Sequence, residues 1–416
     1  MGNSDSVTVQ KRMARFRPEE RSVIDGVFER FAVPSASSSP LVLQATLVPI
    51  AMVTRMFWGL CSIEPGQAEP GRAGAAPGPD REQLTVFLAD VLRGTAEERA
   101  PLVMAMSHNA AGRPQAFLED LITAVVHILT SRGRLQGWRP QQMGDTVLGV
   151  KLLAEQMTSD LRPSDPETCN LSCLEDWVFR VAQVSQYLEV LVAEGLDVSL
   201  SGWTAPALLP PCRDTDWTHL TVLLDVPTLM FLAQLLDESG SYFGSAQPEA
   251  ESHTARKWLC SFEYGGQEHD GVCVCVCAGD SRCFLFSVFP TLRVYTATGY
   301  NEHFMYLNQH QQTMPNGLGM GGQHDYFGLW LDSDFGRGHS RARPKCTTYG
   351  NPQLSADEDF VLDAVEVWAT GNPPDEEEEE GKKSILKVDQ EVQAMMELTG
   401  KTLHSEGFNE LQDDFD

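Results

Sequence analysis

Between residues 18 and 200, apolar residues recur every three or four positions, the period that turns one face of an α-helix toward a core. The first such stretch opens with Pro18-Glu19-Glu20, a composition that suits a first helical turn. Residues 62–80 are rich in Pro, Gly and Ala and indicate a flexible loop. The same spacing predicts further helices over 84–92, 102–107, 117–129, 147–157 and 174–194. This half of the chain is therefore expected to be a helical module.

After a proline-containing stretch at 202–217, the pattern changes to short apolar runs separated by glycines. Such runs are typical of strands and turns in a mostly antiparallel β domain. The runs cover 284–289, 292–296, 303–307, 326–331 and 361–368. We therefore predict an α+β chain, with the helical module at 18–200 followed by a β domain at 218–371.

The last part of the chain has two further patterns. Acidic residues fill 375–380, which predicts a solvated linker over 372–383. An amphipathic helix is predicted over 384–400, and residues 401–416 form an acidic tail that we expect to be disordered. The apolar face of the helix includes Val392, Met395 and Met396. Because a methionine-rich face is pliable, this helix is expected either to enter a partner's groove or to pack on its own domain.

A formal net charge of −27 argues against general affinity for nucleic acid, which needs a basic surface. It also makes the body of the protein repel anionic lipid. The most apolar stretch, 41–60, is interrupted by Gln, Thr, Pro and Arg, so no transmembrane helix is expected. The N-terminus has no apolar signal-peptide core, and the ten cysteines of the chain favour reduced thiols in a cytosolic compartment.

The chain opens Met1-Gly2-Asn3-Ser4-Asp5-Ser6, which fits the N-myristoylation pattern at Gly2. The basic residues that follow include Lys11, Arg12, Arg15 and Arg17. One myristoyl chain gives an association constant on the order of 10⁴ M⁻¹, and each basic residue near an anionic leaflet adds up to about 1 kcal/mol. Residues 1–17 are therefore expected to hold the protein reversibly at a membrane.

Several motifs suggest chemistry that their surroundings do not support. Gly317, Gly319 and Gly322 satisfy G-x-G-x-x-G, but a dinucleotide site needs a helix after the motif and a strand is expected instead. We interpret the motif as a glycine-rich loop at the end of a β-sandwich. The helical module is EF-hand-like, yet no segment supplies the ligands of a calcium loop. The alternating Cys273, Cys275 and Cys277 lack the C-x-x-C spacing of thiolate metal sites.

A Cys/His hydrolase is the remaining enzymatic alternative. Cys346 is accompanied in the β region by His303, His310, His324 and His339. No G-x-S-x-G, H-E-x-x-H or phosphate loop marks a nucleophile, and Cys346 is interpreted as a small buried thiol on a strand. We therefore predict a non-enzymatic protein with no cofactor and no metal.

Several ordered blocks of the β region resemble the TLDc family. They are Arg282–Ser287, Tyr295–Asn301, Gly317–Gln323, Tyr326–Asp332, Asp334–Gly336, Cys346–Tyr349, Asn351–Ser355 and Val365–Trp368. The resemblance implies two packed β-sheets flanked by short helices. It also implies association with the lysosomal membrane, recruitment of mTOR signalling there and docking to the vacuolar proton-pumping ATPase, without an agreed catalytic mechanism.

Residues 240–280 depart from that family pattern. Only Arg256–Cys260 matches it, and Val272–Cys277 is the run that a repeated GT dinucleotide would encode. One interpretation is a gene-model error or a retained intron. If the segment is real, the β domain is expected to lack strands and to expose an unpaired sheet edge.

Together these features favour an adaptor at the cytosolic face of the lysosomal membrane and in the cytoplasm, with mTOR complex components as partners. One alternative is a modulator of the vacuolar ATPase, acting through the C-terminal helix. The other is a protein of oxidation resistance that acts through Cys346.

Overall fold

The structure is a computed structural model. It describes residues 10–31, 47–63, 79–107, 114–135, 146–161, 169–209, 221, 223–235, 243–245, 257–264, 270–276, 281, 283–308, 314–323 and 326–370. Helices come first along the chain and strands follow, so the predicted α+β class is confirmed.

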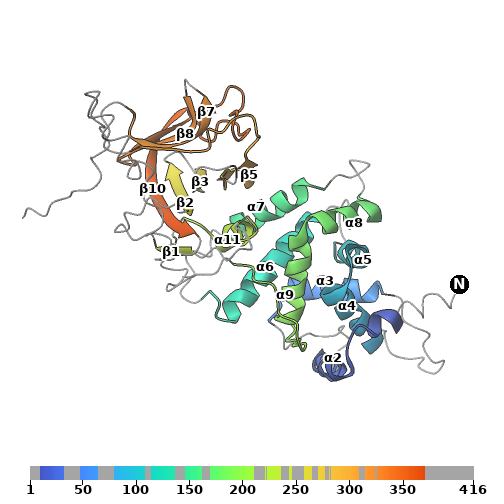
Figure 1. Cartoon of the computed structure of the whole chain (residues 1–416). Helices are drawn as coiled ribbons and strands as arrows, with labels where there is room; N and C mark the ends of the chain where they lie inside the picture. The colour runs from blue at the N-terminus through green and yellow to red at the C-terminus, as the bar shows by residue number, and fades with distance from the viewer. Residues whose placement is uncertain are drawn as a thin grey trace, which may run out of the picture. The chain divides into compact units, whose positions relative to one another are not determined.

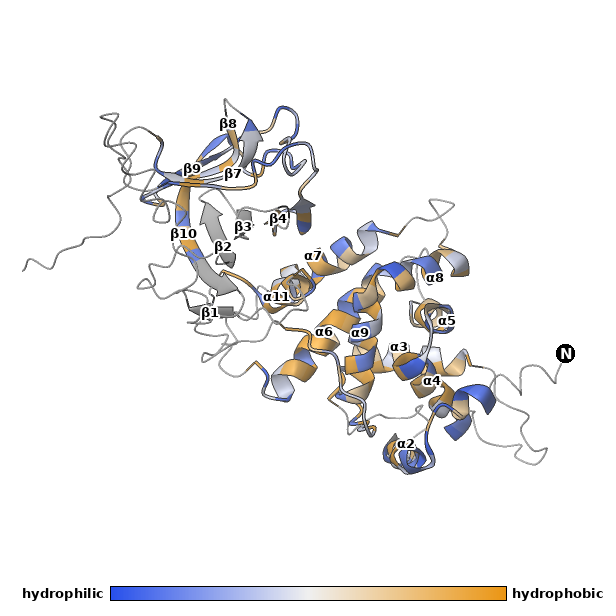
Figure 2. Ribbon diagram, viewed as in Figure 1, coloured by the Kyte–Doolittle hydropathy of each residue, from blue (hydrophilic) through white to orange (hydrophobic). Residues whose placement is uncertain are grey.

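The helical part is organised around one apolar helix. The helices of this part are α2 (Pro18–Phe31), α3 (Ile50–Cys61), α4 (Arg81–Arg93), α5 (Ala96–Met106), α6 (Gln115–Ser131), α7 (Thr146–Ser159), α8 (Leu171–Arg180), α9 (Ala182–Ala193) and α11 (Val226–Leu232). Helix α6 contacts α3, α7, α9 and α11 (Figure 1). Figure 2 shows α6 coloured mostly as hydrophobic, whereas hydrophilic residues cover much of α2. Helix α6 is therefore the centre of this core.

Two neighbouring helices begin with reciprocal side-chain caps. At the start of α4, the Asp80 carboxylate accepts from the Gln83 N–H at 2.7 Å, and the Gln83 side chain accepts from the Asp80 N–H at 2.9 Å. At the start of α5, Thr95 and Glu98 exchange the same pair of bonds. Such a capping box satisfies backbone donors that have no partner within the helix.

The helix predicted over 174–194 is two helices. Val181, with φ −99° and ψ 78°, interrupts it between α8 and α9. Helix α8 packs on α5, while α9 packs on α4 and α6. Trp177 of α8 and Tyr187 of α9 are both fully buried. Tertiary packing therefore overrides a continuous helical pattern.

The apolar periodicity did not reveal two of the helices. Helix α3 overlaps the apolar stretch 41–60, for which only a membrane span was considered and none was expected. Its Arg55 is paired with Asp120 of α6 at 2.6 Å. Helix α11 lies within the range assigned to the β domain but contacts α6 and α7. No helix among the described residues is both long enough and apolar enough to cross a bilayer.

The strands are β1 (Phe243–Ser245), β2 (Lys257–Tyr264), β3 (Asp270–Val276), β4 (Phe284–Ser287), β5 (Arg293–Thr296), β6 (Tyr306–Asn308), β7 (Gly317–Gln323), β8 (Tyr326–Asp332), β9 (Arg337–Ser340) and β10 (Asp359–Thr370). They pair antiparallel in the order β5-β4-β3-β2-β10-β9-β8-β7-β6, and β1 also pairs with β10. The long strand β10 joins two halves: its first three residues pair with β9, and after a register shift between Leu362 and Ala364 it continues along β2 (Figure 1).

The expectation of an unpaired edge at 240–280 is wrong for the described residues. Strand β3 lies between β2 and β4, with Val274 opposite Cys260 on one side and Leu285 on the other. The alternating run at 272–276 therefore has the period-two pattern of an internal strand. Whether the segment arises from a gene-model error stays untested.

Candidate functional site

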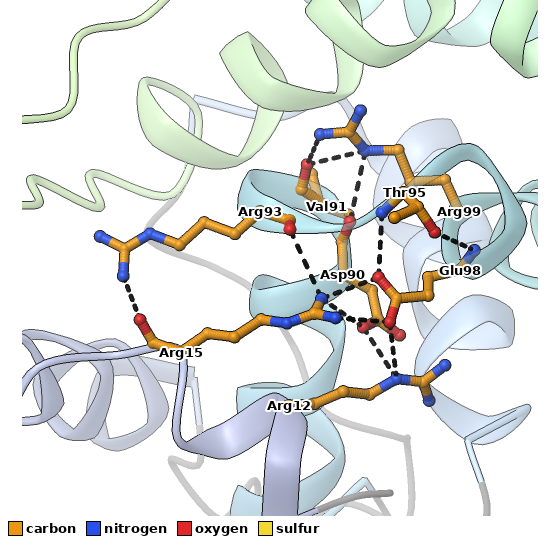
Figure 3. Close-up of polar contacts among 8 residues, drawn as sticks. All are labelled: Arg12, Arg15, Asp90, Val91, Arg93, Thr95, Glu98 and Arg99. Atoms are coloured by element: carbon orange, nitrogen blue, oxygen red, sulfur yellow. Dashed lines mark hydrogen bonds and ion pairs between the residues drawn. The ribbon is translucent and has the colours of Figure 1, made fainter.

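The N-terminal segment, residues 10–17, is held to the helical part by an ionic cluster. The Arg12 Nε lies 3.1 Å from Asp90 Oδ1, and the Arg15 Nη1 donates to Glu98 Oε2 at 2.8 Å. The second nitrogen of Arg15 contacts the other oxygen of Glu98, so this pair is bidentate. Figure 3 shows both arginines reaching from the segment toward the two carboxylates. Because Asp90 is on α4 and Glu98 on α5, the cluster fixes the segment to both helices.

A second contact lies beside the first. Arg93 donates to both oxygens of the Glu20 carboxylate, at 2.6 and 3.0 Å, and also to the Arg15 carbonyl. The Arg93 guanidinium lies 5.3 Å from the centre of the Phe16 ring, and the Phe16 side chain is buried. The segment is therefore anchored by an apolar side chain as well as by charges.

The carboxylates of this site differ in their electrostatics. The hydrogen bond from Arg15 holds the pKa of Glu98 below its ordinary value, and the hydrogen bond from Arg93 does the same for Glu20. Burial raises the pKa of Asp90 to about 7, against the opposing attraction of Arg12. The Asp90 side chain is only 3% exposed, and water therefore stabilises its charge poorly. The pairing of Arg12 with Asp90 is consequently sensitive to pH near neutrality.

The four cations predicted to face a membrane fall into two groups, one paired within the protein and one exposed. Arg12 and Arg15 are engaged with carboxylates of the same chain, whereas Lys11 and Arg17 are exposed. Membrane contact stays a prediction for all four. The lipidation residue Gly2 lies outside the described residues, as do the predicted partner-helix residues Val392, Met395 and Met396.

Sequence reasoning missed the acidic half of this cluster. Thr95-Ala-Glu-Glu98 carries the signature of a capping box, so Glu98 was detectable as a helix-start residue. Nothing local marks Asp90, which sits in an apolar run, or joins it to Arg12, 78 residues earlier.

In the β domain, Cys346 is buried as predicted, but it lies in a loop directly before the turn at 347–349 and not on a strand. A Cβ added at Gly321 or Gly328 would lie less than 3 Å from its sulfur, which shows how closely the thiol packs against β7 and β8. His303 contacts the Gly322 carbonyl at 3.0 Å, and His339 stacks on Trp330. Among the described residues, no group of three His, Cys, Asp or Glu is placed to hold a metal ion.

The predicted glycine-rich loop at 317–322 is strand β7, so that prediction is wrong. Rings from the next strand lie where glycine side chains would be: a Cβ at Gly319 would be 2.5 Å from Phe327, and one at Gly317 would be 2.5 Å from Trp330. Phe327 and Trp330 stack at 4.8 Å between ring centres. The alternation of glycine with Leu318 and Met320, both buried, is therefore a period-two strand pattern.

Comparison with known proteins agrees with this β domain. Residues 275–371 match the family model of the TLDc domain, so the chain is a TLDc-domain protein. It is 52% identical to "MTOR-associated protein MEAK7" of Danio rerio over 455 aligned residues, and 37% identical to the protein of that name from Homo sapiens over 466, with 100% of both chains covered each time. The chain belongs to the MEAK7 family. Nuclear receptor coactivator 7 of Homo sapiens is similar only over 22% of this chain and 9% of that protein, at 36% identity.

Proposed function

We propose that this protein is a non-enzymatic adaptor that supports mTOR signalling at the cytosolic face of the lysosomal membrane. The observation that carries the proposal is similarity along the entire chain to relatives whose name describes them as mTOR-associated. An adaptor raises the effective concentration of two partners by holding them at one surface, which requires no chemistry. The close packing of the Cys346 thiol supports a structural role for that residue.

In this proposal the membrane contact is made by an acyl group on Gly2. Because the net charge is −27, anionic lipid repels the rest of the protein. The acyl group must therefore be supplemented by local cations. The exposed Lys11 and Arg17 are the cations available for this role while Arg12 and Arg15 remain paired.

The ionic cluster gives the anchor a defined attachment point on the protein. Gly2 precedes Gln10 by eight residues, a separation of at most roughly 28 Å in a fully extended chain. Since Arg12, Arg15 and Phe16 fix the segment to α4 and α5, the helical part would stay within that reach of the bilayer surface. The TLDc domain would remain available to bind other proteins.

Within the same proposal, the vacuolar ATPase is the second partner, contacted through the TLDc domain, whereas in the alternative the helix predicted over 384–400 acts on that pump. The alternative function, a modulator of that pump, is separated by deleting residues 384–399. Loss of the pump effect with retained mTOR recruitment would favour the modulator. Loss of both, or of neither, would favour the adaptor.

The direct test compares lysosomes from cells that lack the protein with lysosomes from cells that express the full chain. We expect mTOR on the lysosomes to increase when the full chain is present, and to increase much less with Gly2→Ala. Asn3→Ser is a matched control, because it leaves the acylated glycine intact. Equal mTOR recruitment with and without the protein would overturn the proposal.

A further inference from the structure

The ion pairs of the N-terminal segment lie at the surface of the molecule. Arg12 and Arg15 are paired with carboxylates, yet their side chains keep 23% and 28% of their exposure. The neighbouring Lys11 and Arg17 are exposed. Another anion that approaches the segment can therefore reach both guanidinium groups as well as the two exposed cations.

An anionic bilayer offers these arginines the same chemistry as the carboxylates. A guanidinium pairs with a phosphate or carboxylate through two parallel N–H donors, as Arg15 does with Glu98. Each arginine near an anionic leaflet raises the affinity by up to about fivefold. Because Arg15 directs both terminal nitrogens at Glu98, it cannot pair in this way with a headgroup until it leaves that carboxylate.

The arginine side chains can leave without detaching the main chain of the segment. Arg93 donates to the Arg15 carbonyl, and its guanidinium lies 5.3 Å from the centre of the buried Phe16 ring (Figure 3 shows the bond to the carbonyl). Neither contact uses the guanidinium group of Arg12 or Arg15. The backbone at residues 15 and 16 therefore stays attached while the two side chains exchange partners.

The two carboxylates tolerate the loss of their cations. Glu98 keeps the hydrogen bond from the Thr95 N–H at 2.9 Å, and its side chain is 18% exposed to water. Asp90 is 3% exposed, and burial raises its pKa to about 7, so it can take up a proton when the arginines withdraw. The exchange therefore leaves no unpaired charge buried in the core.

We propose that Arg12 and Arg15 exchange their carboxylate partners in the protein for anionic lipid headgroups at a bilayer, so that the ionic cluster is a clamp that restrains membrane binding. The exchange rests on the membrane contact proposed above for residues 1–17. While the clamp is closed, only Lys11 and Arg17 meet the lipid. On a strongly anionic bilayer the clamp opens, and all four cations contribute.

Binding of the purified, N-myristoylated full chain to phosphatidylcholine vesicles, with and without phosphatidylserine, tests the clamp. Glu98→Gln removes the charge that holds Arg15 but keeps a side chain that suits the α5 capping box. We expect it to bind the phosphatidylserine vesicles up to about fivefold more tightly than the wild type, the contribution of one freed arginine. Binding to pure phosphatidylcholine should not change.

Two controls separate the clamp from a general loss of negative charge. Glu97→Gln removes the same charge from an exposed residue of the same helical turn, and should bind like the wild type. Adding Arg15→Gln to Glu98→Gln should abolish the gain, because the freed arginine is then absent. Arg17→Gln should weaken binding by the same factor with and without Glu98→Gln, since Arg17 lies outside the clamp.

Three results would overturn the inference. Equal affinities of Glu98→Gln and Glu97→Gln for phosphatidylserine vesicles would overturn the clamp and leave the proposed membrane contact intact. The same holds for a gain in Glu98→Gln that survives the addition of Arg15→Gln. Failure of the myristoylated wild-type chain to bind these vesicles would overturn both the clamp and the membrane contact.

Discussion

At the residue scale, the glycines of β7 leave space for aromatic rings of neighbouring strands and not for a ligand. Gly319 lies opposite Trp330 and Tyr306 in the sheet, and Phe327 covers it. Tyr306 lies 5.3 Å from Phe327 and 5.9 Å from Trp330, ring centre to ring centre. Aromatic side chains packed across strands over a glycine stabilise a sheet position that the glycine alone would weaken. The motif is therefore a packing device.

We predict that Gly319→Ala destabilises the protein by about 1–3 kcal/mol, because the added methyl group would sit 2.5 Å from the Phe327 ring and force it to move. Urea denaturation measures the loss. Gly336→Ala is the matched control, since its nearest neighbour would be 3.4 Å away. Equal losses for the two substitutions would show that the ring packing is not responsible.

Asp90 should make stability fall as pH rises. Its pKa is about 7 in the folded protein and near the ordinary 3.8 when unfolded, so between these values the folded state binds a proton that the unfolded state has released. The stabilisation is complete below the lower value and is lost as pH rises through the upper one.

We therefore expect the free energy of unfolding to fall between about pH 5 and pH 7, with Asp90 contributing at most about 1.4 kcal/mol per pH unit. In Asp90→Asn this contribution disappears and the decline is shallower. Urea titrations across the range measure both slopes. Asp197→Asn, at an exposed carboxylate, should keep the wild-type slope. A wild-type slope in Asp90→Asn would contradict the assignment.

At the scale of elements, local patterns identified what local physics controls. Apolar periodicity located α4, α6 and α7. In α6 and α7 the buried residues repeat at the helical period, whereas in α4 residues 83–92 are all buried. It missed the break at Val181, because that turn is set by which helices α8 and α9 pack against. It also missed β7, where glycines hid the strand alternation. The aromatic rings that fill the space beside those glycines come from a neighbouring strand, so the local sequence does not reveal them.

The N-terminal segment and α5 should be coupled energetically through Arg15 and Glu98. A bidentate, partly buried pair is expected to give a coupling of about 1–2 kcal/mol in a double-mutant cycle with Arg15→Ala and Glu98→Gln. The cycle cancels the loss of the α5 cap. The Arg30–Asp197 pair, 45% and 63% exposed, is the control and should give at most about 0.5 kcal/mol. Couplings of equal size for the two pairs would show that the Arg15–Glu98 pair does not hold the N-terminal segment to α5.

At the scale of the whole molecule, the distribution of charge assigns membrane contact to the N-terminal segment. The chain as a whole is strongly acidic, and the segment that follows Gly2 carries a local group of cations that includes Lys11, Arg12, Arg15 and Arg17. Sequence patterns suffice to propose the lipid anchor, because acylation is directed by a short linear motif. They do not show that Arg12 and Arg15 are paired internally, because Asp90 and Glu98 are distant in sequence. The anchor is therefore expected to act with fewer cations than the sequence suggests.

The most direct measurement is the mass of the N-terminal peptide of protein isolated from cells, taken together with its distribution between membrane and soluble fractions. We predict an acyl mass on Gly2 of the membrane-bound protein, and transfer of Gly2→Ala to the soluble fraction with loss of mTOR from lysosomes. An unmodified glycine on protein that still sediments with membranes and recruits mTOR would contradict the account.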